Sequence, residues 1–266
     1  MSDANQAVET VRSADGTPIA HERFGDGPPI ILIGGAFNDR STIRALAEAL
    51  AAAGFTAFAY DRRGRGDSGD TPPYQVRREI EDVAALVEAA GGKAHLYGLS
   101  SGAILAAYAT AHGLPVSGLV MFEPPFQVGP HAGSRPDISA RTAELIAAGD
   151  RAGAVEHFMV TAVGLPAEAV AGMRAEPMWP FLESMAHTLP YDGLISGDGS
   201  LPVDRLAGIG VPTLVVESTA SPQWLRDGAR ATAEAIPGAR HVGLPGGFHE
   251  VPADTLAAEI RRFLLG

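Results

Sequence analysis

Short apolar runs alternate with segments of helical periodicity along most of the chain. The continuous apolar runs, which are typical of strands covered on both faces, lie at residues 29–33, 55–60, 94–97 and 116–122. Residues 75–90 carry an apolar stripe at helical spacing with charged residues opposite, which predicts an amphipathic helix. Because strands alternate with helices, the pattern predicts a parallel sheet with right-handed crossovers.

The two ends of the chain complete the predicted sheet. Residues 8–13 and 18–24 resemble the strands of a hairpin with an Asp15-Gly16 turn, and Ser41 is expected to cap a helix that runs to about Ala53. The remaining predicted elements are strands at 211–216 and 239–244 and helices near 223–236 and 253–265. We therefore expect an α/β fold, a mostly parallel eight-stranded sheet flanked by helices.

The middle of the chain interrupts this alternation. Prolines at 124, 125, 130 and 136 break structure up to about residue 137, and residues 138–206 read as short helices and turns without buried strands. The interruption predicts a helical cap at residues 126–206, inserted into a core formed by residues 1–125 and 207–266.

Composition narrows the possible partners. The formal charge of −11 over 266 residues argues against nucleic acid and disfavours a membrane as partner. The chain has no cysteine, which excludes disulfides and thiolate chemistry and fits the cytoplasm. Residues 1–6 have neither a basic start nor an apolar core, so we expect no signal peptide, and no apolar run approaches the roughly 20 residues needed to span a bilayer. The sequence carries no signal for an oligomeric state.

The segment Gly98-Leu99-Ser100-Ser101-Gly102 stands between a predicted strand and an alanine-rich helix. A Gly-x-Ser-x-Gly pattern in that context predicts a nucleophile elbow, a tight turn that exposes a reactive serine above the sheet. The flanking glycines let strand and helix approach closely. Ser100 also precedes a helix N-terminus, where free N–H groups favour developing negative charge.

Several motifs together make the chain resemble the α/β-hydrolase family. They are the elbow, Gly34-Gly35-Ala36-Phe37, the loop 61–69, Pro212-Thr213-Leu214-Val215-Val216 and Gly246-Gly247-Phe248-His249. The resemblance implies a serine, an acid and a histidine in that chain order. His249 matches the position of the base, in a loop before the final helix. We interpret the arginine-rich loop 61–69 as a structural turn in preference to a substrate-binding one.

The acid departs from the usual pattern of the family. Members usually carry an aspartate after the strand that matches 213–216, and Ser221 stands at that position here. Glu123 is the preferred replacement, because it follows strand 116–122 and should lie at the same sheet edge as Ser100. Glu217 is the rival acid, at the end of the later strand.

An acid at position 123 resembles the layout of the zearalenone lactonases within this superfamily. The resemblance implies that Trp179 and Phe37 contact substrate, although packing in the cap core is an equal interpretation of Trp179. The family layout also implies an oxyanion hole formed by the backbone N–H groups of Ala36 and Ser101.

These features predict a serine hydrolase that cleaves a carboxylic ester or lactone through an acyl-enzyme, with no metal or organic cofactor. A small hydrophobic ester or lactone is the expected partner. The cap supplies apolar candidates for the pocket at Phe126, Phe158, Met159, Met173, Met178, Trp179, Phe181 and Met185.

Because the usual aspartate is missing, a non-hydrolytic ligand-binding or cyclase-like protein on the same fold is the alternative hypothesis. A cofactor-free haloperoxidase or dehalogenase is a weaker one.

Overall fold

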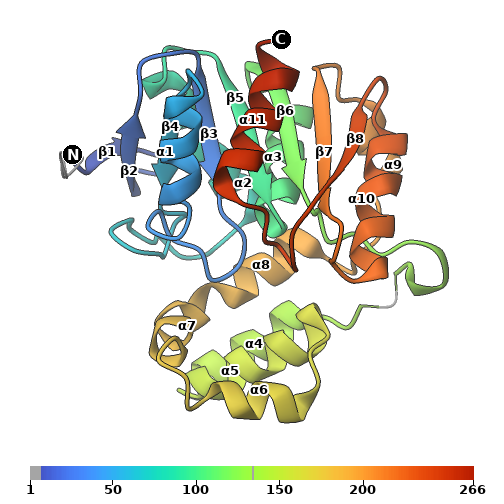
Figure 1. Cartoon of the computed structure of the whole chain (residues 1–266). Coiled ribbons are helices and arrows are strands. Elements are labelled where there is room, and N and C mark those ends of the chain that lie inside the picture. Colours follow the sequence, from blue (N-terminus) through green and yellow to red (C-terminus); the bar gives the residue numbers. More distant parts are fainter. Residues whose placement is uncertain (1–6, 134) are drawn as a thin grey trace.

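The computed structural model describes residues 7–133 and 135–266, and within them eight strands form one sheet in the order β1-β2-β4-β3-β5-β6-β7-β8 (Figure 1). Their bounds are β1 Glu9–Arg12, β2 Pro18–Phe24, β3 Pro29–Ile33, β4 Thr56–Tyr60, β5 Ala94–Leu99, β6 Val116–Phe122, β7 Thr213–Ser218 and β8 Arg240–Leu244. β1 and β4 each pair antiparallel with β2, and the other neighbouring strands are parallel. The predicted eight-stranded, mostly parallel sheet is confirmed.

Helices cover both faces of the sheet, which explains why its central strands are apolar throughout. One face packs against α1 (Arg44–Ala52) and α11 (Ala253–Leu264), which lie side by side in Figure 1. The other face packs against α2 (Val76–Ala89), α3 (Ser101–Ala111), α9 (Val203–Ala207) and α10 (Gln223–Ala235). The chain therefore has one apolar core on each side of the sheet.

A group of helices between β6 and β7 lies beyond one edge of the sheet, at the bottom of Figure 1. It comprises α4 Ile138–Ala147, α5 Arg151–Phe158, a π-helical turn η2 Met159–Val163, α6 Ala167–Met173, α7 Trp179–Met185, a 3-10 turn η3 Ala186–Thr188 and α8 Leu189–Ser196. These helices share an apolar core of their own, with α8 nearest the sheet. We call residues 138–196 the cap helices.

Several element boundaries differ from the predictions by a few residues, and two of the differences have clear local reasons. The first helix begins at Arg44 and not at Ser41, because the Asp39 carboxylate accepts from the N–H groups of Ser41 and Thr42 and holds that segment in turns. Strand β7 continues to Ser218, because its last residues still pair with β8. Glu217 therefore lies within a strand and not in the loop after it.

Residues 1–6, on which the prediction about a signal peptide rests, lie outside the described part of the chain. Among the described residues, no helix is both long enough and apolar enough to cross a membrane.

The sheet topology decides where the predicted site residues meet. Parallel strands present all their carboxyl ends at one sheet edge, and β3, β5, β6, β7 and β8 are consecutive neighbours with this orientation. The loops that follow them carry Ala36, Ser100, Glu123, Ser221 and His249. The cap helices lie beyond this edge (Figure 1), so the gathered residues lie on the side of the sheet that faces the cap.

Candidate active site

Ser100 sits on a strained turn between β5 and α3. Its φ of 56° and ψ of −122° place a non-glycine residue in a conformation that costs energy and persists only where the surroundings enforce it. The Ser100 N–H donates to the Phe122 carbonyl on β6 at 2.9 Å, which anchors the turn to the neighbouring strand. The geometry is that of a nucleophile elbow.

The glycines on either side of the elbow are sterically required. A β-carbon at Gly98 would lie 2.3 Å from the Gly102 carbonyl oxygen, and one at Gly102 would lie 2.3 Å from the Ile33 carbonyl oxygen. Both distances are far below a tolerable contact with backbone atoms. The two glycines thus let α3 start directly against β5 and β3 and aim the Ser100 side chain out of the sheet edge.

Glu123 and His249 form a close pair. The His249 Nδ1 lies 2.7 Å from the Glu123 Oε2, and the His249 backbone N–H donates to the same oxygen at 3.0 Å. The other oxygen, Oε1, accepts from the Ser218 N–H at 2.8 Å. A donating Nδ1–H leaves Nε2 as the basic nitrogen of the ring, and both His249 and Ser100 line one cavity.

The Glu123 side chain is fully buried and ionised. Burial alone raises the pKa of this carboxyl, but hydrogen bonds from His249 and the Ser218 N–H outweigh that effect and hold the pKa below its ordinary value. The hydroxyl of Ser221, where the family usually has aspartate, donates to the Gly247 carbonyl at 3.3 Å in the same loop as His249.

Glu217, the rival acid, lies next to a different histidine. Its Oε2 is 3.0 Å from the Nε2 of His241 on β8, two positions before Gly243, with which Glu217 pairs. Of the two glutamates, the structure places Glu123 and not Glu217 against His249.

The two predicted oxyanion donors flank the elbow serine. Ser101 occupies the first position of α3, where backbone N–H groups have no carbonyl partner within the helix. Ala36 lies in the loop after β3, and its neighbour Gly35 allows this loop to approach the elbow. A β-carbon at Gly35 would lie 3.0 Å from both the Leu99 carbonyl oxygen and the Ser100 β-carbon.

A cavity of about 370 Å³ opens onto Ser100 and His249. Its wall is mostly apolar and includes Ala36, Phe37, Leu99, Pro125, Ile138, Phe158, Met159, Ala162, Val163, Leu165, Met173, Trp224 and Phe248. The polar residues of the wall beyond the elbow and His249 are Asn38, Arg135, Asp192 and Ser196. Phe37 lies where predicted, and its ring packs edge-to-face on Phe158 at 5.5 Å between centroids.

The substrate-contact prediction for Trp179 needs correction. This side chain is 5 % exposed, packs in the apolar core of the cap helices and donates from Nε1 to Glu183 at 2.8 Å. It does not line the cavity. Helix α7 begins at Trp179, and its apolar face turns toward α5 because that is where the cap buries its hydrophobic side chains.

Sequence reasoning found part of the remaining wall. Phe158, Met159 and Met173 line the cavity as predicted, whereas Met178 and Phe181 are exposed and Phe126 and Met185 are buried elsewhere. Among the wall residues that sequence reasoning missed are Trp224, Phe248 and Arg135. The signal for Trp224 was its place at the start of α10, because that helix follows a strand whose carboxyl end meets the site.

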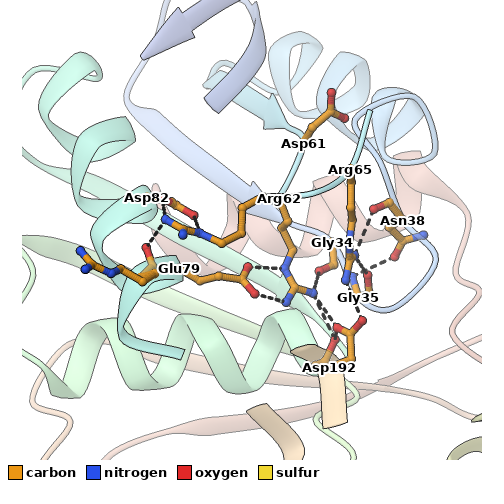
Figure 2. A network of polar contacts seen from close by, with 12 residues as sticks. Gly34, Gly35, Asn38, Asp61, Arg62, Arg65, Glu79, Asp82 and Asp192 are labelled. Carbon is orange, nitrogen blue, oxygen red and sulfur yellow. Dashed lines mark hydrogen bonds and ion pairs between the residues drawn. The ribbon is translucent and has the colours of Figure 1, made fainter. Parts of the chain in front are cut away.

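The loop 61–69 holds three buried arginines. Arg62 donates to Glu79 on α2 through two 2.7 Å hydrogen bonds (Figure 2). Arg63 donates to Asp82 on the same helix. None of residues 61–69 lines the cavity. The contacts therefore favour the interpretation of loop 61–69 as a structural turn over a substrate-binding one.

Comparison with known proteins shows which family and fold this chain is similar to. A model of the alpha/beta hydrolase family matches residues 30–259. The fold is similar to an alpha/beta hydrolase from Sphaerobacter thermophilus, with 50 % identity, 96 % of this chain and 99 % of that chain covered, and a TM-score of 0.90. It is also similar to a hydrolase from Pseudomonas aeruginosa, with 26 % identity, full coverage of both chains (100 % each) and a TM-score of 0.77.

A shorter match joins the chain to an AB hydrolase superfamily protein of Gibberella zeae, 36 % identical over 106 residues. The match covers 37 % of this chain and 38 % of that protein, well under two thirds of its length. The family model, by contrast, runs from β3 into α11 and includes the cap helices. The chain therefore belongs to the alpha/beta hydrolase family.

Proposed function

We propose that the protein is a serine hydrolase that cleaves a carboxylic ester or lactone through an acyl-enzyme. The observation that carries the proposal is the backbone strain at the site. Phe37, Ser100, Glu123 and His249 all have φ between 48° and 58°, and they are the non-glycine residues with positive φ in the described chain. Strain of this kind is held at functional sites, where the surrounding structure maintains it.

In the proposed mechanism each step of acyl transfer is assigned to a residue of the cavity wall or to its partner Glu123. The Ser100 oxygen attacks the carbonyl carbon while His249 takes the hydroxyl proton, and the carbonyl oxygen becomes an oxyanion. The N–H groups of Ala36 and Ser101 stabilise that charge. His249 returns the proton to the leaving alkoxide, and a water activated by the same ring then releases the acid. Glu123 holds the tautomer of His249 throughout and stabilises the imidazolium.

The cavity indicates the class of substrate. A volume of about 370 Å³ lies in the range of small-molecule sites, and a wall built mainly from aliphatic, methionine and aromatic side chains favours an apolar acyl or ring system. We therefore propose a hydrophobic ester or lactone. The glutamate acid supports a zearalenone-type macrolactone as one member of this class, through the sequence resemblance alone.

The alternative, a non-hydrolytic protein on this fold, was motivated by the missing aspartate. The Glu123–His249 pair supplies an acid in its place. No other observation favours the alternative.

The test measures covalent reactivity and turnover together. We expect a fluorophosphonate probe to label the wild-type protein at Ser100, and we expect hydrolysis of para-nitrophenyl esters or of an aromatic macrolactone. Ser100→Ala should lose both labelling and at least about 10⁴-fold in kcat. Ser139→Ala, at a serine of cap helix α4 outside the cavity wall, is the matched control and should behave as the wild type. A folded wild-type protein that the probe leaves unlabelled would refute the proposal.

A further inference from the structure

Two of the buried arginines in loop 61–69 point at the loop that carries Ala36. Arg62 and Arg65 are 1 % and 2 % exposed. Arg65 Nη1 donates to the carbonyl of Gly35 and, at 3.1 Å, to that of Asn38, while Arg62 Nη1 donates to the carbonyl of Gly34 at 3.3 Å (Figure 2). Three carbonyls of the loop after β3 are thus held by two cationic side chains.

The contact with Gly35 bears directly on the oxyanion hole. The Gly35 carbonyl and the Ala36 N–H belong to one planar peptide unit, in which C=O and N–H point in opposite directions. A guanidinium that fixes the carbonyl therefore also fixes the direction of the N–H. It also polarises the peptide and makes the N–H a stronger donor.

One carboxylate of the cap holds this arrangement together. Asp192, on α8, accepts from Arg62 Nη1, Arg65 Nη2 and the Ser101 hydroxyl, each at 2.7 Å. Ser101 contributes the other proposed oxyanion donor. Asp192 thus contacts the residue of one donor directly and reaches the peptide of the other through Arg65.

Asp192 is the counter-ion of the buried Arg65 guanidinium. Arg62 has a second carboxylate partner in Glu79, whereas Asp192 is the carboxylate that pairs with Arg65 among the described residues. Burial lowers the pKa of Arg65, and Asp192 opposes that effect. A buried guanidinium without its counter-ion is strongly unfavourable.

We propose that Arg65 is a positioning residue of the oxyanion hole and that Asp192 of the cap keeps it in place. The proposal rests on the proposed function, because it concerns the hole that serves Ser100. In this arrangement the packing of α8 against the sheet domain affects the geometry of the proposed oxyanion hole through Asp192 and Arg65, and no cap residue has to touch the reacting atoms.

The experiment compares Arg65→Lys with Arg63→Lys. Arg63 is an equally buried arginine of the same loop, but its partners are Asp82, Asp15 and the Arg78 carbonyl, all away from the Ala36 loop. For each variant we would measure kcat and KM for one para-nitrophenyl ester and the Ki of a matching trifluoromethyl ketone. The ketone adds to Ser100 and places its hemiketal oxyanion in the hole.

For Arg65→Lys we expect kcat to fall about 100-fold, the lower end of the loss of one oxyanion donor, with KM within about threefold. The Ki of the ketone should rise in parallel with the loss of kcat. Arg63→Lys should lower the thermal midpoint and leave kcat and Ki unchanged. Asp192→Asn, which keeps the side-chain volume, should change kcat and Ki in the same direction as Arg65→Lys, and circular dichroism would verify that each variant is folded.

Two outcomes separate this proposal from the proposed function. A wild-type protein that neither hydrolyses esters nor binds the ketone refutes the proposed function. The positioning role alone is refuted if the wild-type protein does both but the folded Arg65→Lys and Asp192→Asn variants keep its kcat and Ki. The same conclusion follows if these two variants differ from the wild type no more than Arg63→Lys does.

Discussion

At the scale of single residues, the site depends on side chains held in costly environments. Glu123 is buried, ionised and in a positive-φ conformation, and Ser100 and His249 share that backbone strain. Two aromatic rings contact the ring of His249: Phe248 lies 4.2 Å and Phe122 lies 6.4 Å from it, centroid to centroid. Such a site is organised before substrate binds.

Glu123→Gln is the sharpest test at this scale. The amide keeps the size of the side chain but removes its charge and presents an N–H₂ group to His249, so it disturbs both the tautomer and the imidazolium. We expect kcat to fall by about 10³-fold to 10⁴-fold, measured by steady-state ester hydrolysis. Glu217→Gln is the control and should stay within about threefold of the wild type, because its partner is His241. The reverse pattern would contradict the assignment of the acid.

At the scale of elements, the loop 61–69 connects parts that are distant in the chain. Its arginines bond α2, the loop after β3 and α8, and Arg63 also reaches Asp15 in the turn between β1 and β2 at 3.1 Å. Asp15 in turn accepts from the Thr17 N–H at 3.0 Å. The loop 61–69 thereby connects the edge hairpin β1–β2 with the loop after β3 that carries Ala36.

The tie at Asp15 predicts a pH dependence of stability. Burial raises the pKa of Asp15, but hydrogen bonds from Thr17 and Arg63 outweigh that effect and lower the pKa from an ordinary 3.8 to about 2. The unfolded chain binds a proton at Asp15 more readily than the folded chain does. The contribution of ionised Asp15 to the free energy of unfolding is therefore present at pH values above the ordinary pKa of 3.8 and is lost as the pH falls toward 2.

Asp15→Asn removes that titration and leaves a side chain that can still accept from Thr17. Between about pH 5 and about pH 3, the free energy of unfolding in urea should fall more for the wild type than for Asp15→Asn. An equal fall in the free energy of unfolding of the two proteins would show that Asp15 does not contribute to the pH dependence of stability.

At the scale of the whole molecule, the cap helices are fastened to the sheet domain by polar and aromatic contacts. Tyr191 stacks on Tyr74 at 3.9 Å between ring centroids and donates to Asp70 at 2.7 Å. His187 Nε2 lies 2.7 Å from the Gly64 carbonyl oxygen. With the Asp192 cluster, these contacts surround α8, so we expect the cap and the sheet domain to unfold together.

The two tryptophans allow a direct test of this cooperativity. Trp179 lies in the cap and Trp224 in α10, so Trp224→Phe leaves a reporter of the cap and Trp179→Phe a reporter of the sheet domain. In each variant, the urea midpoints from fluorescence and from far-ultraviolet circular dichroism should coincide. A cap reporter that responds at lower urea than the circular dichroism would contradict coupled unfolding.

The sequence by itself determined the alternation of strands and helices and a mostly parallel eight-stranded sheet, and it singled out Ser100 as the candidate nucleophile. These features are local, since periodicity, apolar runs and the glycines around Ser100 act over a few residues. It also singled out Glu123, but only as one of two acids, because each follows or ends a strand at the same edge.

Only the tertiary structure decided between the two acids. Glu123 and His249 are 126 positions apart in the chain, and their contact depends on how β6 and the loop after β8 are placed. The burial of Trp179 and the attachment of Arg65 to the Gly35 peptide likewise follow from packing between distant elements. Long-range contacts of this kind leave no pattern in a single sequence, because the residues that meet are spaced by the fold and not by the periodicity of any one element.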